Sequence, residues 1–340
     1  MTQPRGALRI DTVANFASLG IAVGHATDEE GATGCTVVRP VEGAMRGAAA
    51  VVGRATGTRD LLPLVTHHLV DRIDAIFLTG GSAYGLDAAA GVMRWMEEHG
   101  RGFPVGGGVV PIVPAAVIFD LAPLGSFAAR PTAAMAYEAA DAARADPIAE
   151  GSVGAGTGAT VGKTNGAGCA MKGGFGCATA RAGHLIAGAV AVVNALGDVR
   201  DGRGRIIAGA RLETGGFADS VALLANGGSR GFAAAAPTNT TLAVVAVSSR
   251  FSRADLGAVA EAATAALHRR ITPAGTAFDG DIVFALAPLD GEPGDPVAAG
   301  VLAAAALEEA IERAVRLARG REGIPGLADE GQQLAAAHSR

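Results

Sequence analysis

The chain has 340 residues, of which 49% are hydrophobic and 18% charged, and its formal net charge is −5. This composition excludes an intrinsically disordered or coiled-coil protein, and it allows a substantial buried core. A negative net charge without a basic run argues against a nucleic-acid-binding surface.

The first residues, the apolar segments and the cysteines indicate where in the cell the protein is expected. The first residues lead into no apolar stretch, and no apolar segment reaches the length of a membrane span, so we expect no signal peptide and no membrane association. Cys35, Cys169 and Cys177 are odd in number and lack zinc-ligand spacing. We therefore expect buried thiols, no metal site and a cytoplasmic protein.

The hydrophobic pattern predicts strands and helices that do not alternate strictly. In chain order, strands are expected over 19–26, 36–38, 75–78, 112–118, 185–193, 242–247 and 282–286. Helices are expected over 85–99, 132–144, 254–270 and 296–319, with Pro273 and Gly320 as stop signals for the last two. A doubly wound sheet requires stricter alternation, so we predict an α/β protein whose sheets are covered by helices on their outer faces.

The glycine-rich segment 151–176, "GSVGAGTGATVGKTNGAGCAMKGGFG", suggests phosphate binding but fits it poorly. A P-loop needs a glycine where Thr157 stands. The dinucleotide pattern is matched by Gly154, Gly156 and Ala159, yet no predicted strand leads in and no helix follows. Nucleotide binding is thus a weak alternative, and we expect no cofactor.

The same segment holds both lysines of the chain, although lysine and arginine together number 28. Lys163 and Lys172 therefore stand out. A lysine amine can lose its proton or act as a compact donor beside a reacting group. The alternative is that both lysines belong to a solvated surface.

The stretch "APTNTTLAVVAVSSR", residues 236–250, sets short polar residues before a buried strand. A turn stabilised by local hydrogen bonds is one interpretation. The other is a nucleophile at Thr240, which needs a base, and the chain has no GxSxG elbow to indicate a Ser-His-Asp arrangement. If the chain is cut before Thr240, the new α-amino group can serve as that base.

Such a site also needs a cation or amide near the amine, donors for the oxyanion and carboxylates that hold the nucleophile. Lys163 is a candidate cation, and Asn194 is an amide within the apolar run "AVVNALGDV". Asp279 and Asp281, in "GTAFDGDIVFALA", face the same side if the segment is extended. The alternative for the aspartates is a turn before the next strand.

Seven motifs together resemble the P1 family of self-processing N-terminal-nucleophile hydrolases. They are "GATGCTVVRP", "LTGGSAYGLDAAAGV", "VPAAVIFDL", "GTGATVGK", "VVNALGDV", "NTTLAVVAV" and "FDGDIVFAL", and they extend over residues 31–286. The family includes L-aminopeptidase/D-esterases, β-aminopeptidases and endo-type 6-aminohexanoate-oligomer hydrolases. The Asn-Thr pair and the paired aspartates look closest to the last of these groups, since the aminopeptidase/esterase members more often have serine as the nucleophile.

The resemblance implies a single hydrolase domain over 1–340 with a four-layer αββα sandwich of the N-terminal-nucleophile type. It implies cleavage between Asn239 and Thr240, which gives an α subunit of residues 1–239 and a β subunit of residues 240–340. It further implies a homo-oligomer of the cleaved αβ unit, such as a tetramer.

The resemblance also gives roles to individual residues. It matches Thr240 to the nucleophile and Asp279 and Asp281 to the acidic pair behind it. It matches Lys163 and Asn194 to residues that assist the reaction or form the oxyanion site, and Phe119 to a substrate-lining position where relatives carry tyrosine.

These observations predict a self-processing hydrolase that forms an acyl-enzyme on Thr240. Its substrate would be a small peptide, amide or ester, and the sequence leaves the class open, linear nylon oligomers included. The alternative from another class is a catalytically silent small-molecule-binding protein that keeps the fold.

Overall fold

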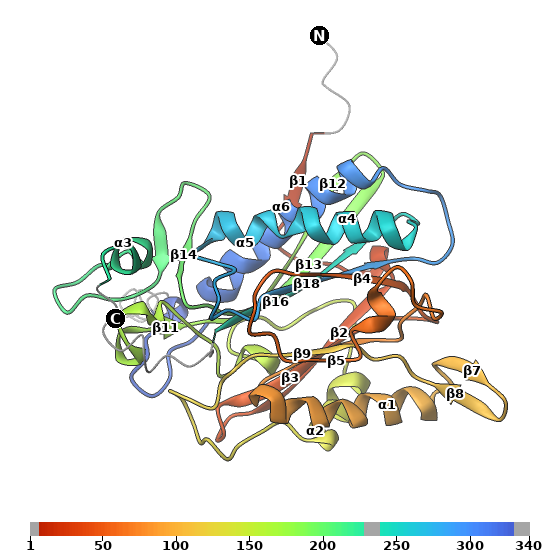
Figure 1. The fold of residues 1–340 in the computed structure, drawn as a ribbon, viewed down its shortest axis with the longest axis horizontal. Helices are drawn as coiled ribbons and strands as arrows, with labels where there is room; N and C mark the ends of the chain where they lie inside the picture. The colour runs from red at the N-terminus through yellow and green to blue at the C-terminus, as the bar shows by residue number, and fades with distance from the viewer. Residues whose placement is uncertain (1–6, 228–238, 330–340) are drawn as a thin grey trace, which may run out of the picture.

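Two β-sheets lie face to face between two layers of helices in the computed structural model, which describes residues 7–227 and 239–329 (Figure 1). Helices α4, α5 and α6 cover the outer face of one sheet, and α1 and α2 cover the outer face of the other (Figure 1). The fold is the four-layer αββα sandwich that the resemblance implied.

The first sheet has six strands, and its only parallel pair lies at the centre of the candidate site. Its order is β1 (Arg9–Asp11), β12 (Gly174–Ala182), β13 (Leu185–Asn194), β16 (Thr240–Val247), β18 (Ile282–Ala287) and β4 (Arg46–Val51). Strands β16 and β18 run parallel and the other neighbours antiparallel. The amino ends of β16 and β18 therefore meet the carboxyl end of β13 at one edge of the sheet.

The second sheet is smaller. Its order is β2 (Ile21–Asp28), β3 (Thr33–Pro40), β6 (Ile76–Thr79), β9 (Ala115–Val117) and β5 (Thr58–Arg59). Three minor sheets complete the strands: β7 (Phe103–Val105) with β8 (Gly108–Val110), β10 (Thr160–Val161) with β11 (Met171–Lys172), and β15 (Ile206–Ala208) with β14 (Asp198–Arg200) and β17 (Ile271–Thr272).

Alternation along the strands separates the apolar layers. In β16, Leu242 and Val244 belong to the core between the two sheets, whereas Ala243 and Val245 belong to the core beneath α4–α6. Successive side chains of a strand point to opposite faces, so an uninterrupted apolar run such as β16 fits a strand buried on both faces.

Several helices begin where a short polar side chain accepts the first free backbone N–H groups. The helices are α1 (Ala89–Glu98), α2 (Ala133–Asp141), α3 (Ser220–Ala225), α4 (Arg253–Ala263), α5 (Ala265–Arg270) and α6 (Pro296–Arg316). Thr132, Ser252 and Asp295 are the capping residues of α2, α4 and α6. Among the described residues, no helix is both long and apolar enough to cross a bilayer.

Each predicted strand and helix has a counterpart in the structure, but two predicted helices differ in form and several observed elements were not predicted. The unpredicted elements are β1, β4, β5, β7, β8, β10, β11, β12, β14, β15, β17 and α3. The region expected as one helix over 254–270 is divided between α4 and α5 at Thr264, and the helix expected over 85–99 begins as a 3-10 turn at Ser82–Ala88. Strands β4 and β12 were missed, because "RGAAAV" and "GFGCATARA" contain mainly small residues of low strand propensity.

Strand β12 needs its glycines for a close approach to α6. A Cβ at Gly176 would lie 2.2 Å from the carbonyl oxygen of Ala310, and one at Gly174 would lie 2.4 Å from that of Ala314. Glycine alone lets helix and sheet backbones come so near. Part of the glycine-rich segment 151–176 is thus explained by packing, and not by phosphate binding.

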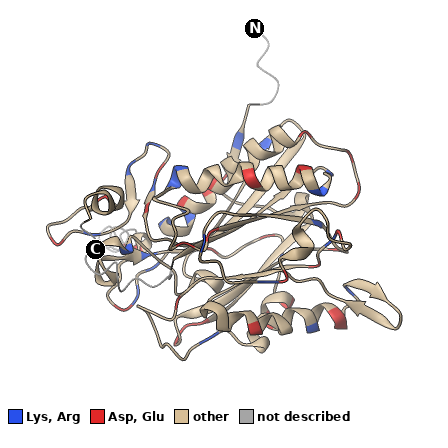
Figure 2. Ribbon diagram, viewed as in Figure 1, with Lys and Arg blue, Asp and Glu red and all other residues tan. Residues whose placement is uncertain are grey.

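Charged side chains lie mostly on the outer helices and loops (Figure 2). Five strands of the two sheets carry none: β6, β9, β13, β16 and β18. The described residues after Gly320 bind to the body of the protein. The carbonyl of Pro325, for example, accepts the backbone N–H of Lys172. Residues 330–340 lie outside the described residues.

Candidate active site

The candidate residues lie at the edge of the first sheet where β13, β16 and β18 meet. Asn194, the last residue of β13, pairs with Thr240, the first residue of β16. Asn239 in turn forms a parallel bridge with Asp279, just before β18. Segments at least 40 residues apart in sequence therefore meet through strand register.

Strand parity decides which side chains share a face. Val192 and Leu242 belong to the core between the sheets, and Asn194 and Thr240 each stand two residues from one of them. Both side chains therefore point to the space between the sheets. Thr241 points the other way, toward the helices.

The hydroxyl of Thr240 touches the carbonyl group that it would attack. Thr240 is only 5% exposed, and its Oγ1 donates a hydrogen bond to the carbonyl oxygen of Asn239 at 2.5 Å. The backbone N–H of Gly280 donates to the same oxygen at 2.8 Å. The carbonyl before Thr240 therefore has a hydroxyl beside it and a backbone donor that polarises it.

Gly280 also makes room for that hydroxyl. A Cβ at this position would lie 2.7 Å from Thr240 Oγ1 and 2.9 Å from the carbonyl oxygen of Ala55. Sequence reasoning considered the two aspartates of "FDGDIV" and missed the glycine between them. The only signal for it was that glycine in a strand often marks a close backbone approach.

Asn239, on the other side of the bond, has a buried side chain that forms no hydrogen bond with the described residues. The residue is 1% exposed, and within the described chain neither Oδ1 nor Nδ2 has a partner. A buried amide in that condition lowers the stability of the folded chain. Unsatisfied groups of this kind occur at positions kept for function.

Lys163 and Asn194 form the second part of the site. Lys163 Nζ donates to Asn194 Oδ1 at 2.9 Å and to the backbone oxygen of Asn194 at 3.1 Å. Burial lowers the pKa of Lys163 to about 7, against the opposing attraction of Asp279. The lysine thus loses its proton far more readily than one in solvent.

The side-chain amide of Asn194 is held at both ends. Its Oδ1 also accepts the backbone N–H of Thr160 at 3.0 Å, and its Nδ2 donates to the carbonyl oxygen of Phe119 at 3.0 Å. Phe119 therefore reaches the site through its backbone, while its half-buried ring stays a predicted substrate contact.

The solvated-surface alternative for the lysines is wrong. Lys172 is 1% exposed and Lys163 is half-buried. Each donates to oxygen atoms of the protein, so neither belongs to a solvated face.

The two aspartates lie close together but bind different segments. Both oxygens of Asp281 accept backbone N–H groups, from Thr241 at 2.6 Å and from Gly275 at 2.9 Å. Asp279 accepts the N–H of Thr276 at 2.8 Å and its hydroxyl at 2.6 Å. The pair thus fixes the loop at Gly275 and Thr276 that leads into β18, and Asp281 also joins it to β16.

Burial raises the pKa values of both carboxyls. The pKa of Asp281 rises to about 7, because burial disfavours the charged form and the neighbouring Asp279 adds repulsion. The pKa of Asp279 is raised by burial as well, while bonds from Thr276 and attraction to Lys163 oppose the rise.

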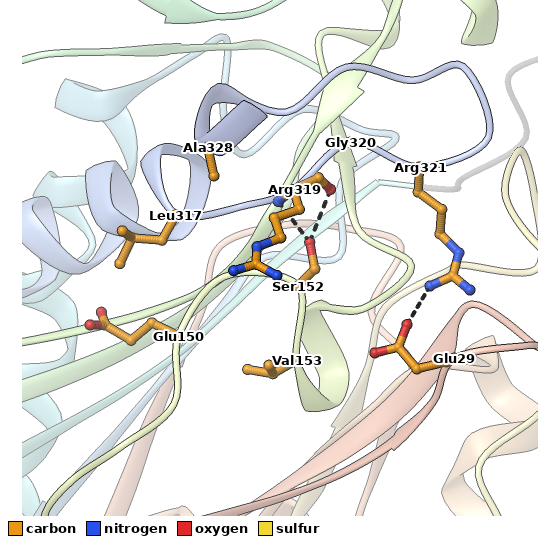
Figure 3. A pocket seen from close by; sticks show the side chains of 9 residues that line it. All are labelled: Glu29, Glu150, Ser152, Val153, Leu317, Arg319, Gly320, Arg321 and Ala328. Carbon is orange, nitrogen blue, oxygen red and sulfur yellow. Dashed lines mark hydrogen bonds and ion pairs between the residues drawn. The ribbon is translucent and has the colours of Figure 1, made fainter. Parts of the chain in front are cut away.

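Other clefts lie away from these residues. A cleft of about 840 Å³ is lined by residues that include Ser152, Arg319 and the ion pair between Glu29 and Arg321, and by none of the candidate site residues (Figure 3). The Ser152 hydroxyl is bonded to the backbone of Arg319. The described part of the chain contains no group of three or more His, Cys, Asp or Glu that could hold a metal ion.

Comparison with known proteins gives one family. The profile of peptidase family S58 matches residues 19–327. An uncharacterized aminopeptidase of Mycobacterium tuberculosis is 45% identical over 291 residues, which cover 84% of this chain and 81% of that protein. A 6-aminohexanoate-oligomer endohydrolase of Agromyces sp. is 31% identical over 279 residues, which cover 78% of this chain and 72% of that protein.

Solved structures share the fold at lower identity. A β-aminopeptidase of Burkholderia sp. has a TM-score of 0.68 at 20% identity and covers 98% of this chain and 97% of its own. An L-aminopeptidase D-Ala-esterase/amidase of Ochrobactrum anthropi, described as a variant of the N-terminal-nucleophile hydrolase fold, has a TM-score of 0.66 at 18% identity. It covers 94% of this chain and 92% of its own.

Proposed function

Since this chain belongs to peptidase family S58 and is a hydrolase that acts on amide bonds, we propose that it cuts itself before Thr240 and then uses Thr240 as an N-terminal nucleophile. One observation supports this most directly. The Thr240 hydroxyl contacts the Asn239 carbonyl, and the Gly280 N–H polarises that carbonyl from the neighbouring strand.

In self-cleavage, Thr240 Oγ1 attacks the carbonyl carbon of Asn239. The C–N bond to Thr240 breaks, the acyl group moves to the hydroxyl oxygen as an ester, and the released amine takes up the hydroxyl proton. Water then hydrolyses the ester, which leaves a carboxylate on Asn239 and both a free amine and a free hydroxyl on Thr240. The Gly280 N–H stabilises the negative oxygen that forms on the way.

Asn239 is suited to leave after this step. Its buried side chain makes no hydrogen bond within the described chain, so its departure breaks none. The space that it vacates is where a substrate acyl group binds, with its carbonyl oxygen near the Gly280 N–H.

In substrate hydrolysis, the α-amine of Thr240 accepts the proton of its own hydroxyl, and Oγ1 attacks the substrate carbonyl carbon. The substrate C–N or C–O bond breaks, and the leaving group takes the proton. Water hydrolyses the resulting acyl-enzyme. Since a free α-amine has an ordinary pKa of about 8, it acts as a base near neutral pH.

Lys163 and Asn194 assist on the same face of the sheet as Thr240. A lysine with a pKa near 7 can exist in either protonation state at neutral pH, and it holds the Asn194 amide in place. We assign Asn194 to the oxyanion site and Lys163 to electrostatic control of the Thr240 amine. Asp279 and Asp281 hold the backbone that carries Thr240 and Gly280.

The substrate is a small peptide, amide or ester. Relatives named aminopeptidases are 45% identical to this chain and those named 6-aminohexanoate-oligomer endohydrolases 31%, which favours an aminopeptidase activity. We propose further that the protein works in the cytoplasm as a homo-oligomer of the αβ unit. The unpaired Cys35, Cys169 and Cys177 support the location, and the family resemblance supports the assembly.

A mass spectrum of the purified protein tests self-cleavage. We expect two fragments, residues 1–239 and 240–340, and a single intact mass from Thr240→Val. A hydrolysis panel then separates the substrate classes: amino-acid p-nitroanilides, amides and esters, β-peptides and linear 6-aminohexanoate oligomers. An intact wild-type chain that hydrolyses none of these would refute the proposal.

A further inference from the structure

A second buried pair of opposite charges, Lys172 and Asp120, lies behind Asn194 and takes no part in the steps above. Lys172 is 1% exposed and Asp120 is 2% exposed. Buried charged groups of this kind are rare because desolvation disfavours them, so they need partners inside the protein. Each of the two attracts the other.

Lys172 binds the backbone of the loop that leads to Thr160. Its Nζ donates to the carbonyl oxygen of Thr157 at 2.7 Å and to that of Ala159 at 2.8 Å. The backbone of Lys172 also pairs with Thr160 across β10 and β11. One side chain thus fixes the two carbonyls on either side of Gly158.

Asp120 binds residues on the other side of this loop. Its Oδ2 accepts the hydroxyl of Thr33 at 2.7 Å, and its Oδ1 accepts the backbone N–H of Gly81 at 2.6 Å. A Cβ at Gly158 would lie 2.6 Å from Asp120 Cβ, so the Asp120 side chain packs directly on the loop that Lys172 holds.

The contacts of Lys172 and of Asp120 both lead to the side chain of Asn194. Thr160, which follows Ala159 in the chain, donates its N–H to Asn194 Oδ1. Phe119, which precedes Asp120, accepts from Asn194 Nδ2. Asn194 Oδ1 is therefore bound by the residue after Ala159, whose carbonyl oxygen Lys172 binds. Asn194 Nδ2 is bound by the residue before Asp120.

We propose that Lys172 and Asp120 are positioning residues that fix the orientation of the Asn194 amide toward Thr240. The proposal rests on the function proposed above, in which Asn194 belongs to the oxyanion site. Neither residue touches the reacting atoms. They act through Thr160 and Phe119, so their loss would let the amide turn without removing it.

The test compares Lys172→Met, which has a similar length and no donor, with the wild type in the full chain. We expect kcat to fall by roughly 10-fold at unchanged KM, because a small misplacement affects the transition state more than substrate binding. Arg321→Met is the matched control. Arg321 repels Lys172 from the rim of the Figure 3 cleft but touches neither loop carbonyl, so kcat should stay the same.

A spectroscopic readout separates positioning from simple stabilisation. The chain has five asparagines, so selective ¹⁵N labelling gives few side-chain amide signals, and the one lost in Asn194→Asp belongs to Asn194. We expect Lys172→Met to shift that signal and Arg321→Met to leave it in place. The double variant Lys172→Met with Asp120→Asn removes both charges, and we expect it to regain Tm without regaining kcat.

The outcomes are distinct. A folded Lys172→Met with unchanged kcat and an unmoved Asn194 signal overturns this inference and leaves the proposed function standing. If circular dichroism shows that Lys172→Met does not fold, Asp120→Asn decides by the same two readouts. An inactive, uncut wild type refutes the proposed function, while the amide signal still tests the positioning.

Discussion

The two faces of the first sheet at the start of β16 hold different groups. The side chains of Thr240 and Asn194 lie on the face toward the second sheet. On this face a Cβ at Gly280 would meet Thr240 Oγ1. On the other face lies Thr241, whose backbone N–H binds Asp281. Two identical neighbours in the sequence thus have different surroundings because a strand alternates its side chains.

Under the proposed function, the sheet separates the reacting groups from the groups that support them. The inter-sheet face presents hydroxyl, amide and amine groups, whereas the carboxylates bind backbone groups that keep the strand ends in register. Variants that change one face only should therefore affect the reaction and its support separately.

The largest effect should come from the matched pair Thr240→Val and Thr241→Val. Valine keeps the shape of threonine and removes the hydroxyl. We expect Thr240→Val to abolish both cleavage and hydrolysis, and Thr241→Val to cut itself and keep most activity. Mass spectrometry and a hydrolysis assay measure the two. Loss of cleavage in Thr241→Val alone would mean that the scissile bond lies one residue further on.

Lys163→Met should lower hydrolysis by at least ~100-fold, the low end of what a positioned catalytic group supplies. Its amine is the group that binds both Asn194 Oδ1 and the Asn194 backbone oxygen. The effect should exceed the roughly 10-fold effect of Lys172→Met, because Lys172 acts on Asn194 only through Thr160. Equal rates for both variants would erase the distinction between a site residue and a positioning residue.

Gly280→Ala should slow self-cleavage by roughly 100-fold, because a displacement of about 1 Å can have such an effect on a reacting group. The added methyl group would lie 2.7 Å from Thr240 Oγ1. Gly257→Ala in α4 is the control, since nothing lies within 4 Å of its Cβ position. Cleavage followed on a gel gives both rates, and a normal rate for Gly280→Ala would mean that the hydroxyl reacts from another position.

Asp279→Asn and Asp281→Asn should each slow cleavage by roughly 10-fold without unfolding the chain. Both oxygens of Asp281 accept N–H groups, and an amide can accept only one of them. A tenfold change equals about 1.4 kcal/mol, close to the worth of one hydrogen bond to a charged group. Gels beside circular dichroism decide, and normal cleavage in both variants would assign the pair to the turn alone.

A further prediction concerns the pH dependence of stability. In the uncut chain the pKa of Asp281 is raised to about 7, from an unfolded value near 4. Between these pH values the folded chain holds a proton that the unfolded chain has lost, so this group makes the free energy of unfolding fall as pH rises.

Asp281→Asn should remove that fall. With both chains kept uncut by Thr240→Val, the difference in Tm, variant minus Asp281 parent, should grow as pH rises from about 4.5 to 7. Thermal melts across this range measure it. A difference that stays constant with pH would show that Asp281 is ionised throughout.

The sequence alone named the residues of the candidate site but did not predict their geometry. The motifs around Thr240, Lys163 and Asn194 led to the family and the αββα fold, both of which are confirmed. Long apolar runs such as 242–247 predicted their strands correctly, because a strand buried on both faces leaves an unbroken pattern. The roles of the individual residues stay predictions.

The contacts between distant segments of the chain were known only from the tertiary structure. The Gly280 N–H reaches the Asn239 carbonyl because β16 and β18 are parallel neighbours, and no local pattern specifies that pairing. Strand β12 lies close to α6 through its glycines, and the buried amine of Lys172 binds carbonyl oxygens of a loop. Sequence patterns record the preferences of single segments, whereas register and burial depend on contacts between segments far apart in the chain.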